Sequence, residues 1–424
     1  MKTKKATIIG GGITGIVSAL YLNKKGYEVS IYEAKKNIGG IKRDADFSGD
    51  KYFNDTQYLN TKSNWMHSFF NNDFKNDLLN FNHTYSSYTD IFDNETVSNL
   101  YAMPVCEDEI ILETNLNHIN KNNVVERFKV YGQKQQRSLL NYIKKFNHNN
   151  YDLHPLHIGQ LLLNRIYFKN NEKKIVHLKK KSKIIDELFG IPRSILFPDT
   201  EKEIIATVPH QGFNVFFDKV SSFLKKKNIN IYCNSPIKPV LKDGSLDKPI
   251  SLLVRNKKIN FELFVWCANP VPLIRAAGIG LLDNPYLKTK SLFCKGVSKK
   301  TINNPHYIQV FSNKSSISRI YIYSLNTNQT KITIETIDDD SDNKDIITFA
   351  KYVLKKCGYD LKIIFENKYI KQKKHFLYTN NDYKKFNKMF DYAKNTNIVC
   401  GAWHINHADE KIKYILKDID QKIS

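Results

Sequence analysis

Three glycines near the N-terminus have the spacing of a turn that binds phosphate groups. Gly10, Gly12 and Gly15 satisfy the GxGxxG pattern, and an acid, Glu33, follows 23 residues after the first of them. In such a turn the first glycine makes the tight bend, the second lets the backbone approach a pyrophosphate, and the third lets the helix pack closely on the strand. The acid can accept hydrogen bonds from ribose hydroxyls. These residue types at these positions predict a dinucleotide-binding site.

The elements that must position this turn can be inferred from the residues around it. The apolar run 6–9 predicts a strand before the turn, and the pattern that begins at Ile13 and Thr14 predicts a helix after it. Residues 27–32 predict a second strand, which ends at Glu33. A helix N-terminus at Ile13 offers unpaired N–H groups and a favourable dipole to phosphates. Because the turn joins a strand to a helix, the pattern indicates a Rossmann-like unit.

The segment after Glu33 resembles the extended FAD signature of the glutathione-reductase-type flavoproteins. Ala34 follows the acid directly, and the pair Gly39-Gly40 begins six residues after the acid. In those flavoproteins a paired glycine passes close to the pyrophosphate or the ribityl chain of the flavin. The resemblance therefore implies FAD rather than NAD as the cofactor, with Ala34, Gly39 and Gly40 among the cofactor-binding residues.

Two later segments resemble the superfamily that contains the amine oxidases, the protoporphyrinogen oxidases and the UDP-galactopyranose mutases. Residues 206–214 are similar to the proline–glycine turn that passes over the flavin ring in these proteins. Residues 397–401 are similar to their C-terminal strand and glycine, after which a helix begins beside the flavin. The further cofactor contacts that the resemblance implies are Gly212, Gly401, Trp403 and His404.

The resemblance also implies a fold and a division into domains. The expected fold is α/β, with a Rossmann-like FAD-binding domain of the glutathione-reductase type and a discontinuous α+β substrate domain. The FAD-binding domain is expected to consist of three segments, 1–65, 201–275 and 381–424. The substrate domain is expected to consist of a largely helical segment, 66–200, and a β-sheet segment, 276–380.

Two side chains are candidates for direct chemistry. His210 lies in the turn that is expected to cross the flavin, and histidine titrates near neutral pH. Arg319 lies in a Ser-Arg-Ile sequence that resembles the Thr-Arg-Ile of the mutases, and a guanidinium can bind an anionic group through two hydrogen bonds. The alternation of isoleucine and tyrosine over 320–323 predicts the half-buried strand that would carry it. A structural ion pair is the competing interpretation for Arg319.

Three functional hypotheses follow from the resemblance. The leading one is an FAD-dependent oxidoreductase of the protoporphyrinogen oxidase/amine oxidase type, in which the substrate transfers a hydride to the flavin. The second is a mutase-like enzyme, in which reduced FAD isomerises a sugar nucleotide. The third is a flavin-binding protein without catalysis. It stays open because Asp55-Thr56-Gln57 replaces a glycine and histidine of the relatives, and Ala402 replaces an arginine of the mutases.

The amino-acid composition limits the kinds of binding partner that are expected. Lys+Arg number 65 and Asp+Glu 42, so the formal charge is 65 − 42 = +23. The lysines are spread along the chain without interleaved aromatic residues, so nucleic acid is not an expected partner. A small-molecule substrate is expected, and the charge leaves a phosphorylated or nucleotide-linked sugar open. The six cysteines are widely spaced, which predicts reduced thiols and no zinc site.

The sequence has no run close to the roughly 20 apolar residues of a membrane-spanning helix. Together with the cysteine pattern, this predicts a cytoplasmic protein without a transmembrane segment. No metal site is expected, and the sequence predicts no oligomeric state.

Overall fold

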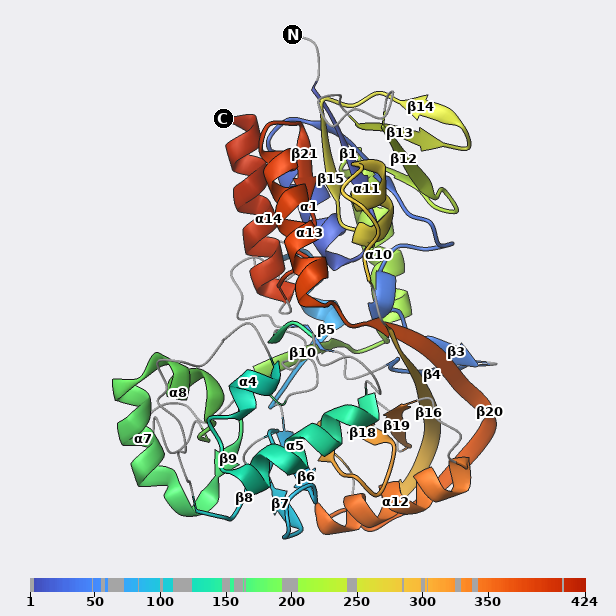
Figure 1. Cartoon of the computed structure of the whole chain (residues 1–424). Helices are drawn as coiled ribbons and strands as arrows, with labels where there is room; N and C mark the ends of the chain where they lie inside the picture. The colour runs from blue at the N-terminus through green and yellow to red at the C-terminus, as the bar shows by residue number, and fades with distance from the viewer. Residues whose placement is uncertain are drawn as a thin grey trace.

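The chain of 424 residues forms two parts, which Figure 1 shows one above the other, with both termini on the upper part. The upper part contains a parallel sheet flanked by helices, and the lower part contains a larger sheet with helices around it. The computed structural model describes residues 4–47, 49–54, 58–59, 72–82, 84–99, 102–109, 124–146, 153–155, 163, 165–192, 205–241, 250–283, 286–298, 302, 304–324, 329–337, 342–405 and 408–424.

The upper sheet has five strands, and every neighbouring pair is parallel. Its strands come from four distant regions of the sequence. The expected strands 6–9 and 27–32 are confirmed with shifts of one residue at their starts. In spatial order the strands are β11 (Asn230–Tyr232), β2 (Glu28–Tyr32), β1 (Lys5–Ile9), β15 (Leu263–Trp266) and β21 (Ile398–Cys400).

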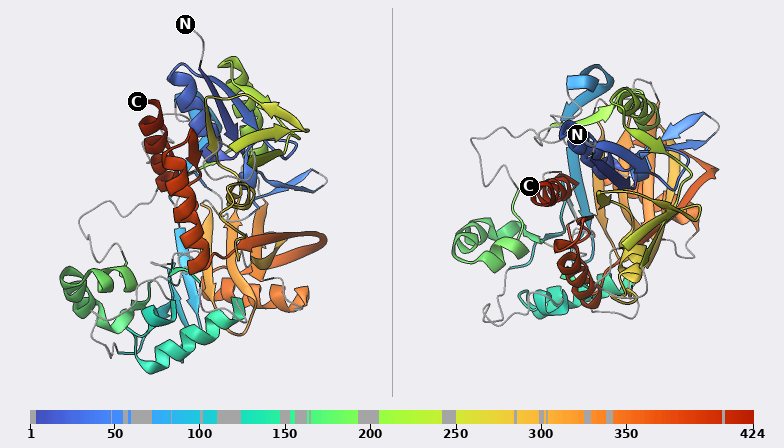
Figure 2. Two further views of the ribbon diagram at one scale, coloured as in Figure 1. Left: turned by 45° about the horizontal axis from the view of Figure 1, so that its top comes forward. Right: turned by 90° about the horizontal axis from the view of Figure 1, so that it is seen from above.

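Helices cover both faces of this sheet because successive side chains of a strand point to opposite faces. Leu263 and Val265 of β15 pack into one core cluster, and Phe264 and Trp266 pack into another. The first cluster contains buried residues of α1 (Ile13–Lys24), α10 (Phe213–Lys226) and α14 (Ala408–Ile423). The second contains residues of α11 (Pro270–Ala276) and α13 (Asn380–Lys394). Figure 2 shows α13 and α14, in dark red, side by side.

A small antiparallel sheet lies beside the second cluster, to which its residues Ile250 and Leu252 contribute. Its strands follow one another along the chain as a meander: β12 (Ile237–Leu241), β13 (Ile250–Val254) and β14 (Lys257–Ile259). Short two-stranded pairs complete the β-structure: β3 (Ala45–Phe47) with β4 (Asp50–Tyr52), β5 (Leu78–Asn82) with β10 (Ile205–Pro209), and β8 (Val105–Cys106) with β9 (Tyr167–Phe168).

The lower sheet has seven strands, and its neighbours are antiparallel except for one parallel pair, β17 with β6. Two regions of the sequence contribute to it, one before residue 100 and one after residue 285. In spatial order its strands are β20 (Leu361–Phe376), β16 (Tyr286–Ser298), β19 (Thr330–Ile337), β18 (Ile317–Tyr323), β17 (His306–Phe311), β6 (Thr84–Thr89) and β7 (Thr96–Ser98).

The two faces of the lower sheet differ in chemistry. Isoleucines such as Ile320 and Ile322 pack against α12 (Asn343–Lys356). On the opposite face Tyr321 and Tyr323 pack with residues of the upper part. The expected strand over 320–323 is confirmed, but its half-buried character is wrong, because all four residues are buried. Helix α12 covers one face and the upper part covers the other.

The region 66–200 contains more than helices. Its described helices are α4 (Val124–Phe128), α5 (Gln133–Phe146), α7 (Glu172–Lys181) and α8 (Lys183–Leu188). The same region also supplies β5 through β9, of which β6 and β7 join the lower sheet. The threonines and tyrosines of β6 are residue types that favour a strand over a helix. Among the described helices, none is both long and apolar enough to cross a membrane.

Candidate cofactor-binding site

The glycine-rich turn connects β1 to α1 at the carboxyl edge of the upper sheet, and two of its glycines are required by the fold. Gly10 has a φ of +100°, and a Cβ there would lie 3.2 Å from the backbone of Cys267 and Ala268. A Cβ on Gly15 would lie 1.9 Å from the carbonyl oxygen of Gly10. These contacts hold the turn tightly between β1, α1 and β15, as the third glycine of the pattern predicts.

Gly12 is different, because neither its backbone nor its neighbours require a glycine. It is the N-cap of α1, with a φ of −73° and a ψ of 176°, which any residue can adopt. Among the described residues, no atom outside the neighbouring backbone lies within 4 Å of the position that a Cβ would take. The space in front of the α1 N-terminus is therefore open, and Ile13 and Thr14 begin the helix beside it. This arrangement fits a pyrophosphate, which would occupy the position of a side chain on Gly12.

Glu33 fastens the end of β2 to the turn. Its side chain is buried (8% exposed), and its Oε2 accepts a hydrogen bond of 2.8 Å from the backbone N–H of Gly11. Its Oε1 accepts a second bond of 2.8 Å from the N–H of Lys35, and the intervening Ala34 is exposed. Each carboxylate oxygen can accept more than one bond, so Glu33 can still bind ribose hydroxyls while it holds the turn.

The paired glycines lie directly against the turn. The N–H of Gly39 donates to the carbonyl oxygen of Gly11 at 2.7 Å, and a Cβ on Gly40 would lie 3.2 Å from the Cα of Gly12. Residues 10–15, Glu33 and the pair Gly39-Gly40 thus form one assembly, which we call the cofactor cradle. The structure brings together the two sequence features that separately indicated a dinucleotide and a flavin.

Gly212 lies at the start of α10, beside the carboxylate of Asp44, which the sequence analysis did not identify. It has a φ of +84° and is the N-cap of α10, and a Cβ there would lie 2.7 Å from Oδ2 of Asp44. That oxygen accepts a hydrogen bond of 3.0 Å from the N–H of Asn214. Asp44 follows the paired glycines by four residues, but nothing local in the sequence indicates that it reaches the start of a helix 170 residues later.

The C-terminal residues that the resemblance implied have two different environments. A Cβ on Gly401 would lie 2.6 Å from the carbonyl oxygen of Trp266, and Trp403 donates from Nε1 to the carbonyl oxygen of Ala268 at 3.2 Å. Ala268 borders Gly10, so Trp403 lies near the cofactor cradle. Ala402, where mutases have arginine, is a buried core residue.

His404 is directed between helices. Its ring centroid lies 4.9 Å from that of Phe390 on α13 and 4.9 Å from that of Tyr414 on α14. Burial, and secondarily the nearby charge of Lys411, lowers the pKa of His404, so the neutral form is favoured. A cofactor contact by His404 stays a prediction.

His210 forms hydrogen bonds with the neighbouring segment that contains Asn76 and Asp77. Its Nε2 lies 3.1 Å from the carbonyl oxygen of Asn76, and its backbone N–H donates to the carbonyl oxygen of Asp77. Because a carbonyl only accepts, this bond requires the proton on Nε2. The imidazole is partly exposed. A catalytic role for His210 stays a prediction.

Arg319 forms the structural ion pair that was its competing interpretation. Its Nε lies 2.9 Å from Oε2 of Glu335, which faces it across β18 and β19. The Glu335 side chain is 9% exposed, and that of Arg319 is 31% exposed. The positive charge of Arg319 therefore partly compensates the negative charge of the buried Glu335 carboxylate. The segment Asp55-Thr56-Gln57 lies outside the described residues.

Phe53 connects the lower sheet to the start of α10. Its ring centroid lies 4.4 Å from that of Tyr323 and 5.4 Å from that of Phe213. Its N–H donates to the Tyr323 hydroxyl at 2.7 Å, and the Thr333 hydroxyl donates to its carbonyl oxygen at 2.8 Å. Burial raises the pKa of Tyr323, so this hydroxyl stays protonated. We call the side of the sheet that carries Tyr307, Tyr321 and Tyr323 the tyrosine face.

Tyr323→Phe should lower the free energy of unfolding by about 1–3 kcal/mol, because the buried N–H of Phe53 would lose its acceptor. Urea denaturation followed by circular dichroism measures this loss. Tyr232→Phe is the matched control, since that side chain is exposed and its loss of a hydroxyl should change little. Equal stability of the two variants would contradict the hydrogen bond.

Comparisons with known proteins agree with this geometry. Residues 8–79 match the family model of the NAD(P)-binding Rossmann-like domain. A 4,4'-diapolycopen-4-al dehydrogenase from Metabacillus indicus is 58% identical over 36 residues, which is 8% of this chain and 7% of that protein. A 1-hydroxycarotenoid 3,4-desaturase from Flavobacterium sp. (strain P99-3) is 45% identical over 49 residues, which is 12% of this chain and 10% of that protein. The chain thus covers a tenth or less of these curated relatives.

Solved structures match almost the whole chain at low identity. A protoporphyrinogen oxidase-like protein from Exiguobacterium sp. 255-15 has a TM-score of 0.59 and 11% identity, covering 99% of both chains. A reduced UDP-galactopyranose mutase has a TM-score of 0.56 and 10% identity, covering 100% of this chain and 94% of the other. A fatty acid isomerase from P. acnes has a TM-score of 0.54 and 13% identity, covering 100% of both chains.

The chain shares the overall fold of these solved structures, and its residues 8–79 belong to a Rossmann-like unit. The match over residues 8–79 includes the whole cofactor cradle, so the region that a Rossmann family model matches is also the region that the contacts hold together. The structural likeness covers both parts of the chain and reflects the fold alone.

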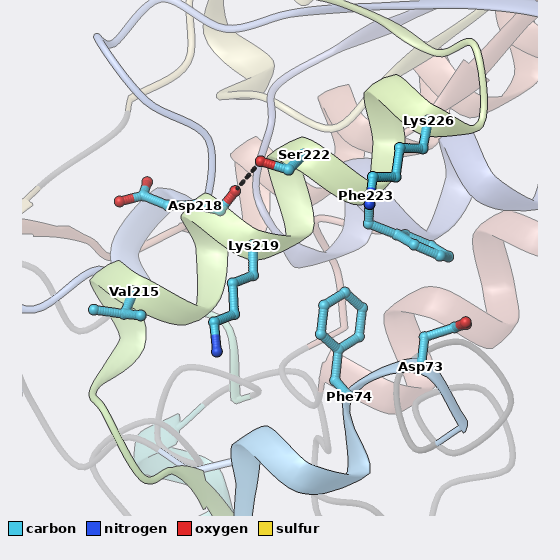
Figure 3. Close-up of a pocket in the computed structure, with 8 residues that line it drawn as sticks. All are labelled: Asp73, Phe74, Val215, Asp218, Lys219, Ser222, Phe223 and Lys226. Atoms are coloured by element: carbon cyan, nitrogen blue, oxygen red, sulfur yellow. Dashed lines mark hydrogen bonds between the residues drawn. The ribbon is translucent and has the colours of Figure 1, made fainter.

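A surface groove of about 520 Å³ lies on the outward side of α10, away from the cradle. Figure 3 shows it between α10 and the short helix α3 (Asn72–Phe74), with Phe74 and Phe223 close together. Its lining residues are Asp73, Phe74, Val215, Asp218, Lys219, Ser222, Phe223 and Lys226. They do not include the glycines of the cradle, so this groove is separate from the candidate site.

Proposed function

We propose that the protein is an FAD-dependent oxidoreductase of the protoporphyrinogen oxidase/amine oxidase type, in which a small-molecule substrate transfers a hydride to the flavin. The observation that carries the proposal is the open space at Gly12, bordered by the α1 N-terminus and by Gly40. Further support comes from the curated relatives, whose names are those of a dehydrogenase and a desaturase.

The residues that would hold FAD are those of the cradle and its surroundings. The N-terminus of α1 would bind the pyrophosphate, and Glu33 would bind the adenosine ribose. When bound, FAD supplies the hydride acceptor, and the chain supplies orientation and electrostatics. The proposed cofactor-binding residues are Gly10, Gly12, Ile13, Thr14, Gly15, Glu33, Ala34, Gly39, Gly40, Gly212, Gly401, Trp403 and His404.

We also propose the corresponding division of the chain. The FAD-binding domain would consist of 1–65, 201–275 and 381–424, and the parallel sheet draws its strands from these segments. The substrate domain would consist of 66–200 and 276–380, which supply the strands of the seven-stranded sheet. The substrate would lie between the flavin and the tyrosine face.

The substrate class is proposed from the same relatives. Two of them carry carotenoid names and one structural neighbour is a fatty acid isomerase, which favours an apolar, unsaturated substrate. The names of the curated relatives do not support a sugar nucleotide, and Arg319, the candidate for binding an anionic group, pairs with Glu335 through its Nε. Direct roles for His210 and Arg319 remain part of the proposal to be tested.

Anaerobic mixing tests the reaction. The FAD-loaded protein would be mixed separately with a carotenoid, an unsaturated fatty acid, an amine, a porphyrinogen and a UDP-sugar. The flavin absorbance at about 450 nm would then be followed. We expect bleaching with an apolar unsaturated compound and none with the UDP-sugar. Isomerisation of the UDP-sugar by the reduced protein would replace the proposal with the mutase hypothesis. A bound flavin that no substrate reduces would favour a flavin-binding protein without catalysis.

Glu33→Gln should weaken FAD binding by about tenfold, because an amide has a single acceptor oxygen where Glu33 uses two and must also bind ribose. Fluorescence titration with FAD measures the dissociation constant. Glu28→Gln, an exposed position at the start of the same strand, is the matched control and should bind FAD as the unmodified protein does. If both variants bind equally well, Glu33 does not contact the cofactor.

A further inference from the structure

Asp44 is a buried carboxylate that fixes the start of α10. It is 8% exposed, and it lies between the paired glycines and β3. Its Oδ2 accepts the N–H of Asn214 at 3.0 Å, and the absence of a side chain at Gly212 makes room for this oxygen. One half of the carboxylate therefore has a structural role as an external cap of a helix of 14 residues.

The other half of the carboxylate has no comparable role. Oδ1 is buried, and no described residue donates a hydrogen bond to it. Burial is the main reason that the pKa of Asp44 is raised, to about 6, although the α10 N–H groups and the charges of Lys51 and Lys331 act in the opposite direction. A buried acceptor oxygen without a donor costs free energy, so native proteins usually supply a donor from the chain, from water or from a ligand.

The surrounding charges do not complete the site. Lys331 donates from Nζ to the carbonyl oxygen of Lys51 at 2.7 Å and lies 4.9 Å above the ring of Tyr52. Burial lowers the pKa of Lys331, although Asp44 is among the charges that raise it. Asp44 and Lys331 therefore shift the pKa of one another through their charges. The two residues do not form an ion pair among the described residues.

The position of Asp44 links the two halves of the candidate site. It follows Gly40, which borders the pyrophosphate position, by four residues. On its other side lies Phe213, which contacts Phe53 and, through it, Tyr323 of the tyrosine face. Figure 1 shows β3 and β4, which follow Asp44, at the junction of the upper and lower parts. A dinucleotide that extends from the cradle toward the tyrosine face would pass this carboxylate.

We propose that Asp44 is a positioning residue whose second oxygen accepts a hydrogen bond from a hydroxyl or N–H group on the flavin half of FAD. This inference rests on the proposed FAD cofactor. One carboxylate then fixes both the start of α10 and the cofactor, so the flavin and the Gly212 turn keep a constant relative position. The adenine half, which lies at Glu33, does not take part.

The proposal has a consequence for pH dependence. The ionised carboxylate can accept bonds on both oxygens, whereas the protonated carboxyl presents one fewer acceptor. FAD would therefore bind the ionised form more tightly and lower the pKa of Asp44. Binding would release a proton near pH 6, and affinity would rise as the pH increases from 5 to 7.

The other titratable groups whose charges interact with Asp44 are Lys51 on β4, Tyr323 on β18 and Lys331 on β19. Lysine and tyrosine side chains ordinarily titrate well above neutral pH. His404, a proposed cofactor contact that also titrates below neutral pH, is present in every variant, so a change in affinity between pH 5 and 7 is assigned to Asp44 only if Asp44→Asn abolishes it.

Titrations with two ligands test the proposal. FAD and ADP would be titrated into the cofactor-free full-length chain at pH 5, 6, 7 and 8, with Asp44→Asn and Asp46→Asn as variants. Asparagine keeps an acceptor oxygen for the N–H of Asn214, and Asp46 is an exposed neighbour on β3. Circular dichroism confirms that each variant is folded.

In the unmodified chain and in Asp46→Asn we expect FAD to bind about fivefold more weakly at pH 5 than at pH 7. In Asp44→Asn we expect FAD binding at pH 7 to be about tenfold weaker and independent of pH, with ADP binding unchanged. An unmodified chain whose FAD affinity is flat from pH 5 to 7, or an Asp44→Asn variant that matches it, would overturn the inference. Failure of the unmodified chain to bind FAD at any pH would instead refute the proposed function.

Discussion

Gly12→Val will abolish flavin retention and leave the fold intact. The backbone of Gly12 is in a conformation that valine adopts freely, and no described atom outside the neighbouring backbone lies within 4 Å of the new Cβ, so we expect the protein itself to tolerate the change. The added side chain would fill the space in front of the α1 N-terminus, where the pyrophosphate is proposed to lie. We expect FAD affinity to fall by about a hundredfold or more, the equivalent of about 3 kcal/mol.

Two measurements on the same sample check this result. The ratio of flavin to protein after reconstitution reports cofactor binding, and the thermal midpoint without FAD reports the fold. Gly12→Ala is the graded control, because its smaller side chain should weaken binding less than valine does. Retention of flavin by the valine variant would show that the ligand does not approach Gly12.

Gly15→Ala will have the opposite profile and will destabilise the protein itself. The new Cβ would lie 1.9 Å from the carbonyl oxygen of Gly10, and both atoms belong to a turn that is fixed between β1 and α1. Relief of this overlap requires α1 to move away from the sheet, where Ile16 and Val17 are fully buried. We expect the free energy of unfolding to fall by about 3 kcal/mol or more.

Urea denaturation in the absence of FAD measures this loss. Gly296→Ala in β16 is the matched control: its Cβ would meet the ends of the Ile332 and Thr330 side chains, the nearest at 3.1 Å, and these side chains can move. The control should lose less than half as much stability. If Gly15→Ala is as stable as Gly296→Ala, the close packing of the turn is wrong.

The features that sequence predicted well are those whose signals are local. The strand, turn and helix over residues 5–24 lie within one short stretch, and the spacing of Gly10, Gly12 and Gly15 identifies the turn without reference to the rest of the chain. The resemblance implies that Gly39-Gly40 passes close to the cofactor, and the hydrogen bond from Gly39 to Gly11 holds this pair against the glycine-rich turn. Short-range patterns of this kind depend little on the rest of the fold.

The features that sequence missed depend on contacts between distant residues. The bond between Asp44 and Asn214 joins positions 170 residues apart, and the pairing of Arg319 with Glu335 depends on the register of β18 and β19. The two-sided burial of the strand over 320–323 depends on α12 covering one face. No local pattern encodes such contacts, because they arise only when the sheets and helices are assembled.

The most direct test of the account is the absorption spectrum of the purified protein, after incubation with FAD and removal of the excess, before and after addition of dithionite. The account predicts one FAD per chain, with absorption bands at about 375 and 450 nm that dithionite bleaches. A protein that is folded by circular dichroism yet stays colourless after incubation with FAD would contradict the central claim that the cradle around Gly12 holds a flavin.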